Sequence, residues 1–417
     1  MTSSKPPGEQ ASTTEGERAT VLSGDDTGAI EPTSESTPVT AAELGSHLAF
    51  FIPDLSLGGA EQVTVTIING LAERGYDVEL LLSRATGELQ SELSPQVDVV
   101  EFGPDTVTGL GVASHVPALV EYLDREQPAA LFPHLAHVSV VCLAARRFVD
   151  AEVPIFPTHH KAFRVQPDPS SKARVVRRLA ERLYPSAEQV VAVSGGVAES
   201  LAEHTPIDPD DVSVLYNPVD VETIRARARE PVDHPWIEDE DVPVVLFVGR
   251  HERQKDLETW LAAFEQVHVR NPQVRGVVAG KGSQTDKIRE LAEQHGIEDA
   301  LSLPGYVENP YRYMRQADVY LLSSRYEGLP TVMIEAFACG CPIVATDCPA
   351  GPREILADGE YGPLVPVGDA NALARAVEET LENPVDSSVI EHRAGEFAPA
   401  SIIDDYEQFL QEHVVSV

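Results

Sequence analysis

Buried-strand patterns and amphipathic-helix patterns alternate along the chain from His47 onward. Residues 47–55 are mainly apolar, a pattern typical of a buried strand, and residues 61–74 have helical spacing that ends at Gly75. A second apolar run at 77–82 completes a strand–helix–strand unit, which indicates a parallel sheet. Further strands of this half are predicted at 129–134, 153–160, 189–194 and 212–220.

The same alternation starts again after residue 241. Strands are predicted at 242–250, 275–282, 301–306, 318–324 and 341–347, with helical patterns between them. Between the two halves, residues 230–241 carry six acids and two prolines, a composition typical of a linker or a lobe edge. The fold class predicted is α/β, with two facing Rossmann-like doubly wound lobes. Ligands are expected in the cleft, at the carboxyl ends of both sets of strands.

Length and composition divide the chain into five segments. Its 417 residues exceed what one hydrophobic core usually organises. Residues 1–44 contain 14 Ser and Thr, no aromatic residue, and eight acids against two bases, which is typical of a disordered tail. The predicted segments are the tail at 1–44, an N-terminal lobe at 45–228, an acidic linker at 229–242, a C-terminal lobe at 243–399, and a helix at 400–417 that packs back on the N-terminal lobe.

The charge of the chain is strongly negative. Asp and Glu number 67 against 31 Lys and Arg, a formal net charge of −36, which disfavours nucleic acid as a partner. The tail carries −6 of this, so −30 remains on the other residues. Only six of the 31 basic residues are Lys, and an acidic, lysine-poor surface is typical of proteins from extreme halophiles. An ordinary acidic enzyme is the alternative.

Two features bear on the cellular location. No apolar run approaches the roughly 20 residues that a membrane-spanning helix requires, and the first residues lack a signal-peptide pattern. The four cysteines are too few to staple a chain of this size, which favours a reduced compartment. We therefore expect a cytoplasmic protein.

The segment 323–354 carries two carboxylates beside a predicted helix start. Glu327 lies in a loop after a buried strand, Pro330 stands where the helix begins, and Glu335 lies in its first turns. The amino end of a helix attracts an anion, and a carboxylate beside it can accept hydrogen bonds from paired hydroxyls such as those of ribose. The alternative is a solvated loop Glu and a helix-start Glu favoured by the dipole.

A second group is cationic. The predicted strand at 242–250 ends in Gly249 and Arg250, and Lys255 follows before an amphipathic helix. Arg offers a planar fork and Lys a compact charge, a combination suited to a diphosphate, although surface Arg and Lys are common.

Taken together, these segments resemble the retaining GT-B glycosyltransferases of family 4. The resemblance covers about residues 47–395. The matching motifs are Glu327 and Glu335 within EGLPTVMIEAFACGCPIVAT, Gly249-Arg250 with Lys255, Gly58-Gly59-Ala60-Glu61, VAVS at 191–194, YNPVD at 216–220, and PGYVEN at 304–309.

The resemblance implies a role for each matching position. Arg250 and Lys255 would hold the donor diphosphate, Glu335 the ribose hydroxyls, and Glu327 the donor sugar. Many members carry Gly at the position of Asp256, so this residue would place a carboxylate near the phosphate site. Backbone groups complete the implied site: Gly58 and Gly59 facing the phosphates, Gly328 and Leu329 near the sugar and phosphate, and Tyr306 and Val307 beside the base.

Two histidines compete for one further position. Family members often carry a His at the end of the fourth strand of the first lobe, in contact with the transferred sugar. Here the segment FPHLAHVSV offers both His134 and His137. We assign His137 to catalysis and His134 to donor binding, and the alternative is that either imidazole only caps a strand or helix.

A reversal of charge marks residues 161–182. Seven bases and two acids occur there, and apolar residues share one helical face with arginines beside them. Such a helix can lie on an anionic membrane or attract a phosphate-linked acceptor. The alternative is a helix packed on its own lobe, with arginines that pair with the acidic surface.

The function implied by the resemblance is transfer of a sugar, with retention, from a nucleotide sugar such as a UDP- or GDP-sugar to a lipid-linked or growing glycan. Retention in this family is described as front-face displacement, in which a departing phosphate oxygen takes the acceptor proton. No metal and no separate cofactor are expected, because Arg250, Lys255 and the helix start would stabilise the departing diphosphate. A nucleotide-sugar epimerase of the same two-lobe architecture and a non-catalytic sugar-nucleotide sensor are the alternatives.

Overall fold

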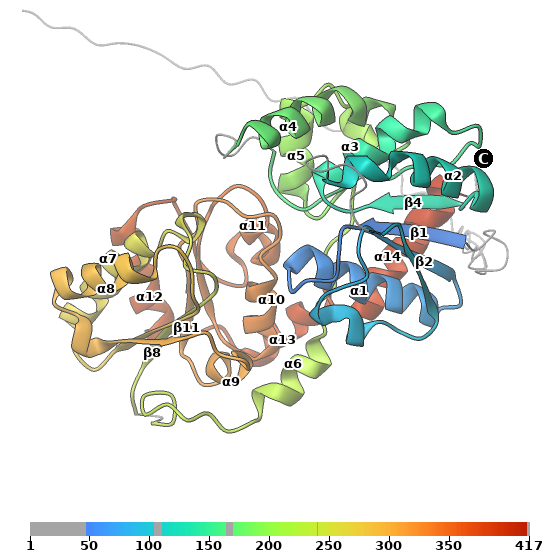
Figure 1. The fold of residues 1–417 in the computed structure, drawn as a ribbon. Coiled ribbons are helices and arrows are strands. Elements are labelled where there is room, and N and C mark those ends of the chain that lie inside the picture. The colour runs from blue at the N-terminus through green and yellow to red at the C-terminus, as the bar shows by residue number, and fades with distance from the viewer. Residues whose placement is uncertain (1–46, 104–110, 164–169, 240, 415–417) are drawn as a thin grey trace, which may run out of the picture. The chain divides into compact units, whose positions relative to one another are not determined.

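The computed structural model describes residues 47–103, 111–163, 170–239 and 241–414. The predicted tail at 1–44 lies outside these ranges. Two larger parallel sheets and one smaller one organise the described residues (Figure 1). All three sheets belong to one compact unit.

The first sheet has the strand order β3-β2-β1-β4, and every strand pair in it is parallel. Phe50 and Phe132 face α1 (Gly59–Glu73) and the C-terminal helix, while Phe51 and Leu131 face α2 (Val116–Glu126) and α3 (Ala136–Ala145). Successive side chains of a strand point to opposite faces. The strands are β1 (His47–Ile52), β2 (Asp77–Leu82), β3 (Val97–Glu101) and β4 (Ala130–Pro133).

A three-stranded parallel sheet continues this lobe, in the order β5-β6-β7. Single bridges from Leu131 to Ile155 and from His134 to Thr158 connect it to β4. Its strands are β5 (Thr158–His159), β6 (Val190–Ala192) and β7 (Val212–Val214).

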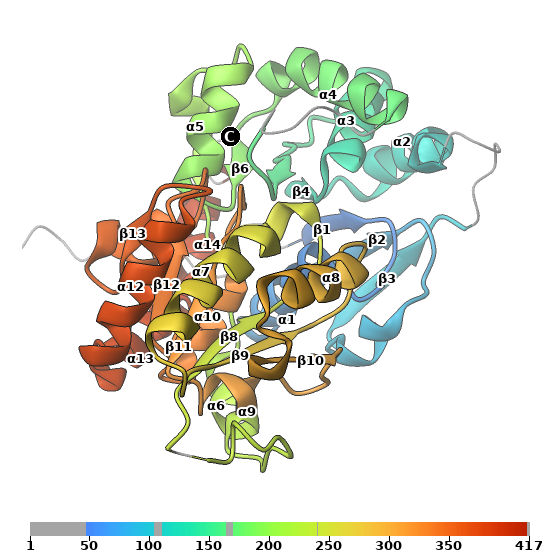
Figure 2. The same cartoon turned by 90° about the vertical axis from the view of Figure 1, so that its left-hand side faces the viewer.

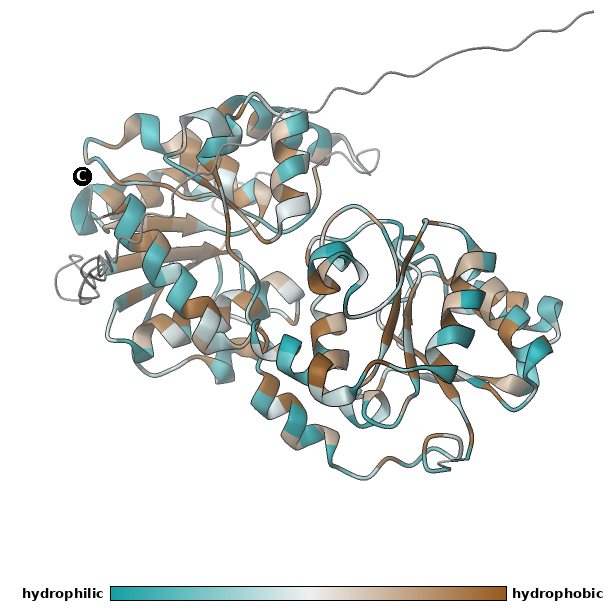
Figure 3. Ribbon diagram, turned by 180° about the vertical axis from the view of Figure 1, so that it is seen from behind, coloured by the Kyte–Doolittle hydropathy of each residue, from teal (hydrophilic) through white to brown (hydrophobic). Residues whose placement is uncertain are grey.

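The second large sheet has the order β10-β9-β8-β11-β12-β13 and is also parallel. Val245 and Phe247 pack against α7 (Leu257–Arg270), α8 (Thr285–His295) and α12 (Ala370–Glu382). Leu246 and Tyr320 pack against α10 (Thr331–Ala338). Figure 2 shows α7 and α8 over one face of this sheet, and in Figure 3 its strands are mainly brown, as expected for strands buried on both faces. The strands are β8 (Val244–Val248), β9 (Arg275–Ala279), β10 (Leu301–Gly305), β11 (Val319–Leu322), β12 (Ile343–Thr346) and β13 (Leu364–Val365).

Helices connect the strands, as the alternating pattern predicts. The helix predicted at 61–74 begins two residues earlier, at Gly59, with Gly58 as its N-cap. The helices are α1 (Gly59–Glu73), α2 (Val116–Glu126), α3 (Ala136–Ala145), α4 (Ser171–Leu183), α5 (Gly195–His204), α6 (Val221–Ala228), α7 (Leu257–Arg270), α8 (Thr285–His295), α9 (Tyr311–Met314), α10 (Thr331–Ala338), α11 (Pro352–Ile355), α12 (Ala370–Glu382), α13 (Ser387–Gly395) and α14 (Pro399–His413).

Two connecting segments cross between the lobes. The acidic stretch after α6 is anchored at a sheet edge, where His234 bonds Ser302 and Arg275 lies over the Trp236 ring. The last helix, α14, returns to the first lobe, where its Phe409 packs against Phe132. Figure 1 shows α14 beside α1 and β1.

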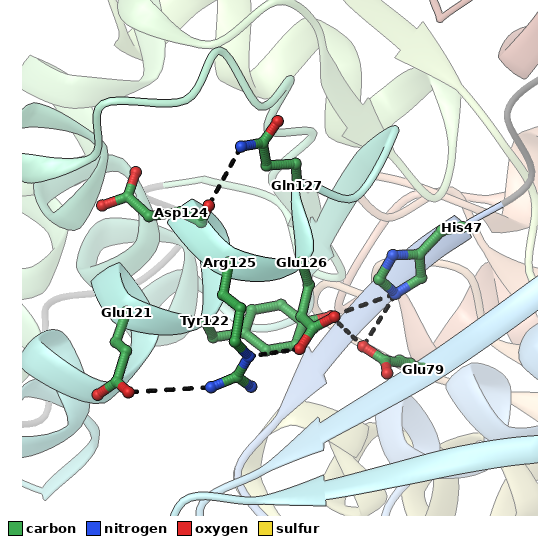
Figure 4. Close-up of polar contacts among 8 residues, drawn as sticks. All are labelled: His47, Glu79, Glu121, Tyr122, Asp124, Arg125, Glu126 and Gln127. Carbon is green, nitrogen blue, oxygen red and sulfur yellow. Dashed lines mark hydrogen bonds and ion pairs between the residues drawn. The ribbon is translucent and has the colours of Figure 1, made fainter.

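A polar network fastens β1 and β2 to α2 (Figure 4). His47 Nε2 lies 2.9 Å from a Glu79 carboxylate oxygen, and the Tyr122 hydroxyl donates to the same oxygen. Burial and this carboxylate raise the pKa of Tyr122, so the phenol stays a donor.

Among the described helices, none has the length and apolar character needed to cross a membrane.

Candidate active site

Strand order decides where the functional loops meet. Numbered within its lobe, the second sheet has the doubly wound order 3-2-1-4-5-6, so the connections leave in opposite directions after β8 and β11. The first sheet reverses in the same way between β1 and β4. Ligands bind at such reversals because the two diverging loops leave a crevice. The candidate residues after β1, β8 and β11 stand at these points.

A cleft of about 580 Å³ lies where these loops meet. The N-terminal lobe contributes the start of α1, Leu135, the segment after β5 and Asn217. The second lobe contributes the loops after β8 and β11 and the start of α10. The cleft is lined by Gly59, Ala60, Glu61, Leu135, His160, Lys161, Asn217, Val248, Gly249, Arg250, Gln254, Lys255, Glu327, Gly328, Leu329, Pro330, Thr331, Val332 and Glu335.

Glu327 is the most fully bonded carboxylate of the cleft. One oxygen accepts from Lys255 Nζ at 2.7 Å and from Ser324 Oγ at 2.6 Å, and the other accepts from Gln254 Nε2 at 2.9 Å. Its exposed fraction is 6%. These partners fix the carboxylate and hold the Lys255 ammonium at the cleft wall, with Arg250 lining the same space.

Glu335 occupies the second turn of α10 and lines the cleft. Burial raises the pKa of its carboxyl to about 7, against a hydrogen bond from Thr331 and the charge of Lys255, which both lower it. The amino end of α10 faces the same space through Thr331 and Val332, and it offers backbone N–H groups to an anion.

The histidines divide differently from the assignment made on sequence. His134 is fully buried, and its Nδ1 lies 3.0 Å from His160 Nε2 and 2.9 Å from Thr64 Oγ1. His137 is exposed in the first turn of α3 and is not among the residues that line the cleft. His160, after β5, does line it, and burial with the neighbouring His159 and Lys161 lowers its pKa to about 3. Its imidazole is therefore neutral at physiological pH.

The sequence places His160 and Lys161 at the end of a predicted strand but does not assign either residue to the site. They close the predicted strand at 153–160, at the same carboxyl edge that supplies His134. The pattern of apolar and charged positions assigns them only to a strand and to the start of the basic segment. Two adjacent histidines give no indication of which one faces a cleft, because that depends on the lobe opposite.

The remaining candidate positions are spread around the cleft. Gly59 lines it, and Gly58 precedes it as the N-cap of α1. Tyr306 follows β10 with an exposed fraction of 67%, and neither Tyr306 nor Val307 lines the cleft itself. Gly328 lines it at a point of close approach, since a Cβ there would lie 2.1 Å from the His160 carbonyl oxygen. Only glycine fits between these two loops.

Hydrogen bonds join the lobes beside this approach. Ser194 Oγ donates to the Gly328 carbonyl at 2.9 Å. The Glu354 carboxylate accepts from the backbone N–H groups of Gly195 and Gly196, at 2.6 and 3.0 Å, at the amino end of α5. A carboxylate is favoured there by the helix dipole, so these contacts hold α5 against α11.

The carboxylate of Asp256 does not point into the cleft. It bonds Arg325 and Thr259 instead, on the other side of the turn that carries Lys255. The carboxylate expected near the phosphate site is therefore next to Lys255 in the chain, but its oxygens are bonded to Arg325 and Thr259. Within the described ranges, no group of three or more His, Cys, Asp or Glu is placed to hold a metal ion.

Sequence comparisons assign the chain to a family. The profile described as "Glycosyltransferase Family 4" matches residues 57–223, and the one described as "Glycosyl transferases group 1" matches residues 229–398. The two matches cover both lobes, including the loops that form the cleft. The chain belongs to the family-4 glycosyltransferases and has the GT-B fold.

Curated relatives match over most of their length. An N-acetylgalactosamine-N,N'-diacetylbacillosaminyl-diphospho-undecaprenol 4-alpha-N-acetylgalactosaminyltransferase of Campylobacter jejuni is 27% identical over 346 residues, 81% of this chain and 90% of that protein. A D-inositol 3-phosphate glycosyltransferase of Geodermatophilus obscurus is 28% identical, covering 78% of each chain.

Solved structures agree on the fold. HepE of Anabaena in complex with UDP-glucose superimposes with a TM-score of 0.70 at 20% identity, covering 89% of this chain and all of that one. Sucrose-phosphate synthase from Thermosynechococcus elongatus gives a TM-score of 0.72 at 21% identity, with 89% of this chain covered. The chain is thus a glycosyltransferase enzyme of glycan biosynthesis.

Proposed function

We propose that this glycosyltransferase acts with retention and without a metal, on a nucleotide-sugar donor and a lipid-linked or growing glycan. The observation that carries the proposal is the convergence of Lys255, Glu327 and the amino end of α10 on one cleft, with Arg250 beside them. Two cations and a helix start can stabilise the charge that develops on a departing diphosphate. HepE, whose fold the chain shares, was solved with UDP-glucose, which supports a nucleotide-sugar donor.

In the proposed reaction the donor lies along the second lobe. Arg250 and Lys255 hold the diphosphate, Glu335 the ribose hydroxyls, and Glu327 the sugar, while the backbone around Tyr306 and Val307 flanks the base. The bond between sugar and phosphate oxygen breaks as the acceptor hydroxyl approaches the same face, and a phosphate oxygen takes the acceptor proton. Glu327 is already bonded to Lys255, Gln254 and Ser324, and on this route it need not act as a nucleophile.

We also propose a division of work between the lobes. Residues 45–228 would receive the acceptor and residues 243–399 the donor, with 229–242 as the linker and the helix at 400–417 returning to the first lobe. The placement of Arg250, Lys255 and Glu335 on the second lobe supports this division.

The exposed side chains of the basic helix α4 support the proposal that the acceptor is associated with a membrane. Arg174 and Arg178 are exposed, and so are two apolar residues one turn apart, Val175 at 55% and Leu179 at 40%. The helix still packs on its own lobe through Ala180 and Leu183. A helix that leaves apolar side chains exposed among cations suits an anionic leaflet. We therefore propose that the enzyme works in the cytoplasm, on the inner face of the membrane of a halophile.

One assay tests the central proposal. The purified enzyme is incubated with UDP- and GDP-sugars and a polyprenyl-diphosphate-linked acceptor, with and without EDTA, and the anomeric configuration of the product is determined by NMR. We expect a product of the donor's configuration and equal rates with chelator. An inverted product, or loss of activity with EDTA that a divalent metal restores, would contradict the mechanism.

The same assay without acceptor addresses the epimerase alternative. An epimerase would convert the donor sugar to its epimer, whereas a transferase should leave the donor unchanged apart from slow hydrolysis. The two curated relatives named above are transferases, which supports the second outcome.

A further inference from the structure

Asp256 adopts a backbone conformation that few residues other than glycine adopt. Its φ and ψ are 47° and 50°, in the left-handed region, and its exposed fraction is 4%. Aspartate tolerates this region better than most side chains do. The residue directly follows Lys255 and is the N-cap of α7. A buried carboxylate therefore lies one residue from a cation of the proposed donor site.

Arg325 neutralises that carboxylate. One oxygen of Asp256 accepts from an Arg325 guanidinium nitrogen at 2.7 Å, and the other accepts from Thr259 Oγ at 2.8 Å. The hydrogen bond to Asp256 raises the pKa of Arg325. Without its partner, a carboxylate with 2% side-chain exposure would be an uncompensated buried charge.

The ion pair lies behind the cleft. Asp256 and Arg325 line a separate pocket of about 320 Å³, on which Arg253, Glu258 and Lys287 also border. Neither member of the pair is among the residues that line the cleft. Because Arg325 does not line the cleft, we expect it to affect a bound donor through the turn that carries Lys255 and through its charge.

Hydrogen bonds connect this turn to the loop after β11. The backbone N–H of Arg325 donates to the Gln254 carbonyl at 2.8 Å, and Ser323 Oγ donates to the Lys255 carbonyl at 2.7 Å. Gln254 Nε2 donates to the Tyr326 carbonyl at 3.0 Å. Besides the ion pair, three hydrogen bonds thus hold the loop that carries Lys255 to the loop that carries Glu327.

We propose that Arg325 is a positioning and charge-compensating residue for donor binding. It holds the left-handed turn at Asp256, and it cancels a negative charge that would otherwise reduce the positive potential at Lys255. The inference rests on the proposed function, in which Lys255 binds the donor diphosphate. Loss of Arg325 should weaken binding of a diphosphate, and removal of the Asp256 charge should restore it.

Calorimetric titration with UDP, GDP and inorganic pyrophosphate tests this in four proteins: the parent, Arg325→Met, Asp256→Asn, and the double variant. Arg325→Met should weaken diphosphate binding about 3- to 10-fold, as expected for an uncompensated charge near a partly buried site. The double variant should return to within about twofold of the parent, because Asn tolerates the left-handed turn and carries no charge. Asp256→Asn alone should bind at least as tightly as the parent.

Arg270→Met is the matched control. Arg270 ends the same helix α7, at the opposite end from Asp256; its side chain is 50% exposed, and it pairs with Glu378 at 2.7 Å. Its loss should leave diphosphate binding unchanged. If Arg325→Met does not fold, Arg325→Lys, which keeps the charge, should bind within about twofold of the parent.

Three results would overturn the inference. If Arg325→Met binds diphosphates as tightly as the parent, the charge of Asp256 does not affect diphosphate binding. A double variant as weak as Arg325→Met would show that the loss is not electrostatic. Failure of the parent itself to bind UDP, GDP or pyrophosphate would overturn the proposed donor site, and the inference with it.

Discussion

In the proposed donor site, recognition of charge and recognition of hydroxyls are assigned to different side chains. On that proposal Arg250 and Lys255 would face a group whose negative charge grows as the sugar leaves, so Ala at either position should lower turnover more than it weakens donor binding. Glu335 would hold hydroxyls alike in the ground and transition states, so Glu335→Ala should cost mainly binding, about 1–3 kcal/mol. Turnover and donor dissociation constants of these variants distinguish effects on catalysis from effects on binding, and the exposed Lys287→Ala serves as control. Full activity in both cation variants would refute the roles proposed for Arg250 and Lys255.

Glu335 also predicts a pH dependence of stability. Its pKa is about 7 in the folded protein against 4.5 in the unfolded chain, so the folded state holds the proton more tightly. This contribution is fully present below pH 4.5 and is lost as the pH rises to about 7, because an ionised buried carboxylate is disfavoured. Glu335→Gln, which cannot ionise, should therefore gain about 1–3 kcal/mol over the parent at about pH 8 and almost nothing at about pH 4. Urea unfolding at the two pH values measures it, and an equal gain at both would argue against the raised pKa.

We expect opposite effects from replacing His160 and His137. His160 lines the cleft and is neutral, so it can exchange a hydrogen bond with a sugar hydroxyl, whereas His137 is exposed on α3. His160→Ala should reduce turnover about 10-fold or more, the scale of one lost hydrogen bond in a transition state. His137→Ala then serves as the neighbouring control. The reverse order of effects would support the assignment of His137 that the sequence suggested.

Among the elements, α4 carries the test of membrane association. Changing Lys172, Arg174 and Arg178 to Glu should release the enzyme from anionic vesicles, since each base near such a surface is worth about 1 kcal/mol. Donor binding should be unaffected, because none of the three lines the cleft. The matched control reverses three exposed bases of the second lobe, Lys287, Arg289 and Arg375. Equal sedimentation of both variants with anionic vesicles would favour a helix that only packs on its own lobe.

The strands and helices around the cleft also show which structural features the sequence pattern could predict. The strands after which Gly249, Glu327 and His134 stand are continuous apolar runs, and burial on both faces leaves little choice of structure for such runs. The outer side of α4 was less predictable. Val175 and Leu179 fit the apolar stripe of a packed helix, yet the neighbouring elements cover only Ala180 and Leu183 fully. Which part of a stripe is covered depends on the partner helix, and the sequence of α4 does not contain that partner.

For the whole molecule, net charge predicts a dependence on salt. A charge of −36, with only six Lys in the chain, implies self-repulsion that molar salt would screen. Melting temperature should therefore fall as salt drops from about 2 M toward about 0.1 M, where the Debye length is already about 10 Å. Differential scanning calorimetry across this range, with sucrose at matched viscosity as control, measures it. A melting temperature independent of salt would refute the proposed halophilic adaptation.

Features that depend on neighbours along the chain could be predicted from the sequence alone. The two-lobe α/β class follows from apolar runs and helical spacing, and Glu327 and Glu335 fall into one cleft because a single loop and helix carry both. Features that depend on residues far apart in the chain emerged only in the folded protein. Arg325 meets Asp256 across 69 positions, and the His160 carbonyl leaves room only for glycine at Gly328. Local sequence preferences determine the helices and strands. Pairs such as Arg325 with Asp256 depend on packing and on the compensation of buried charge, and only folding brings their members together.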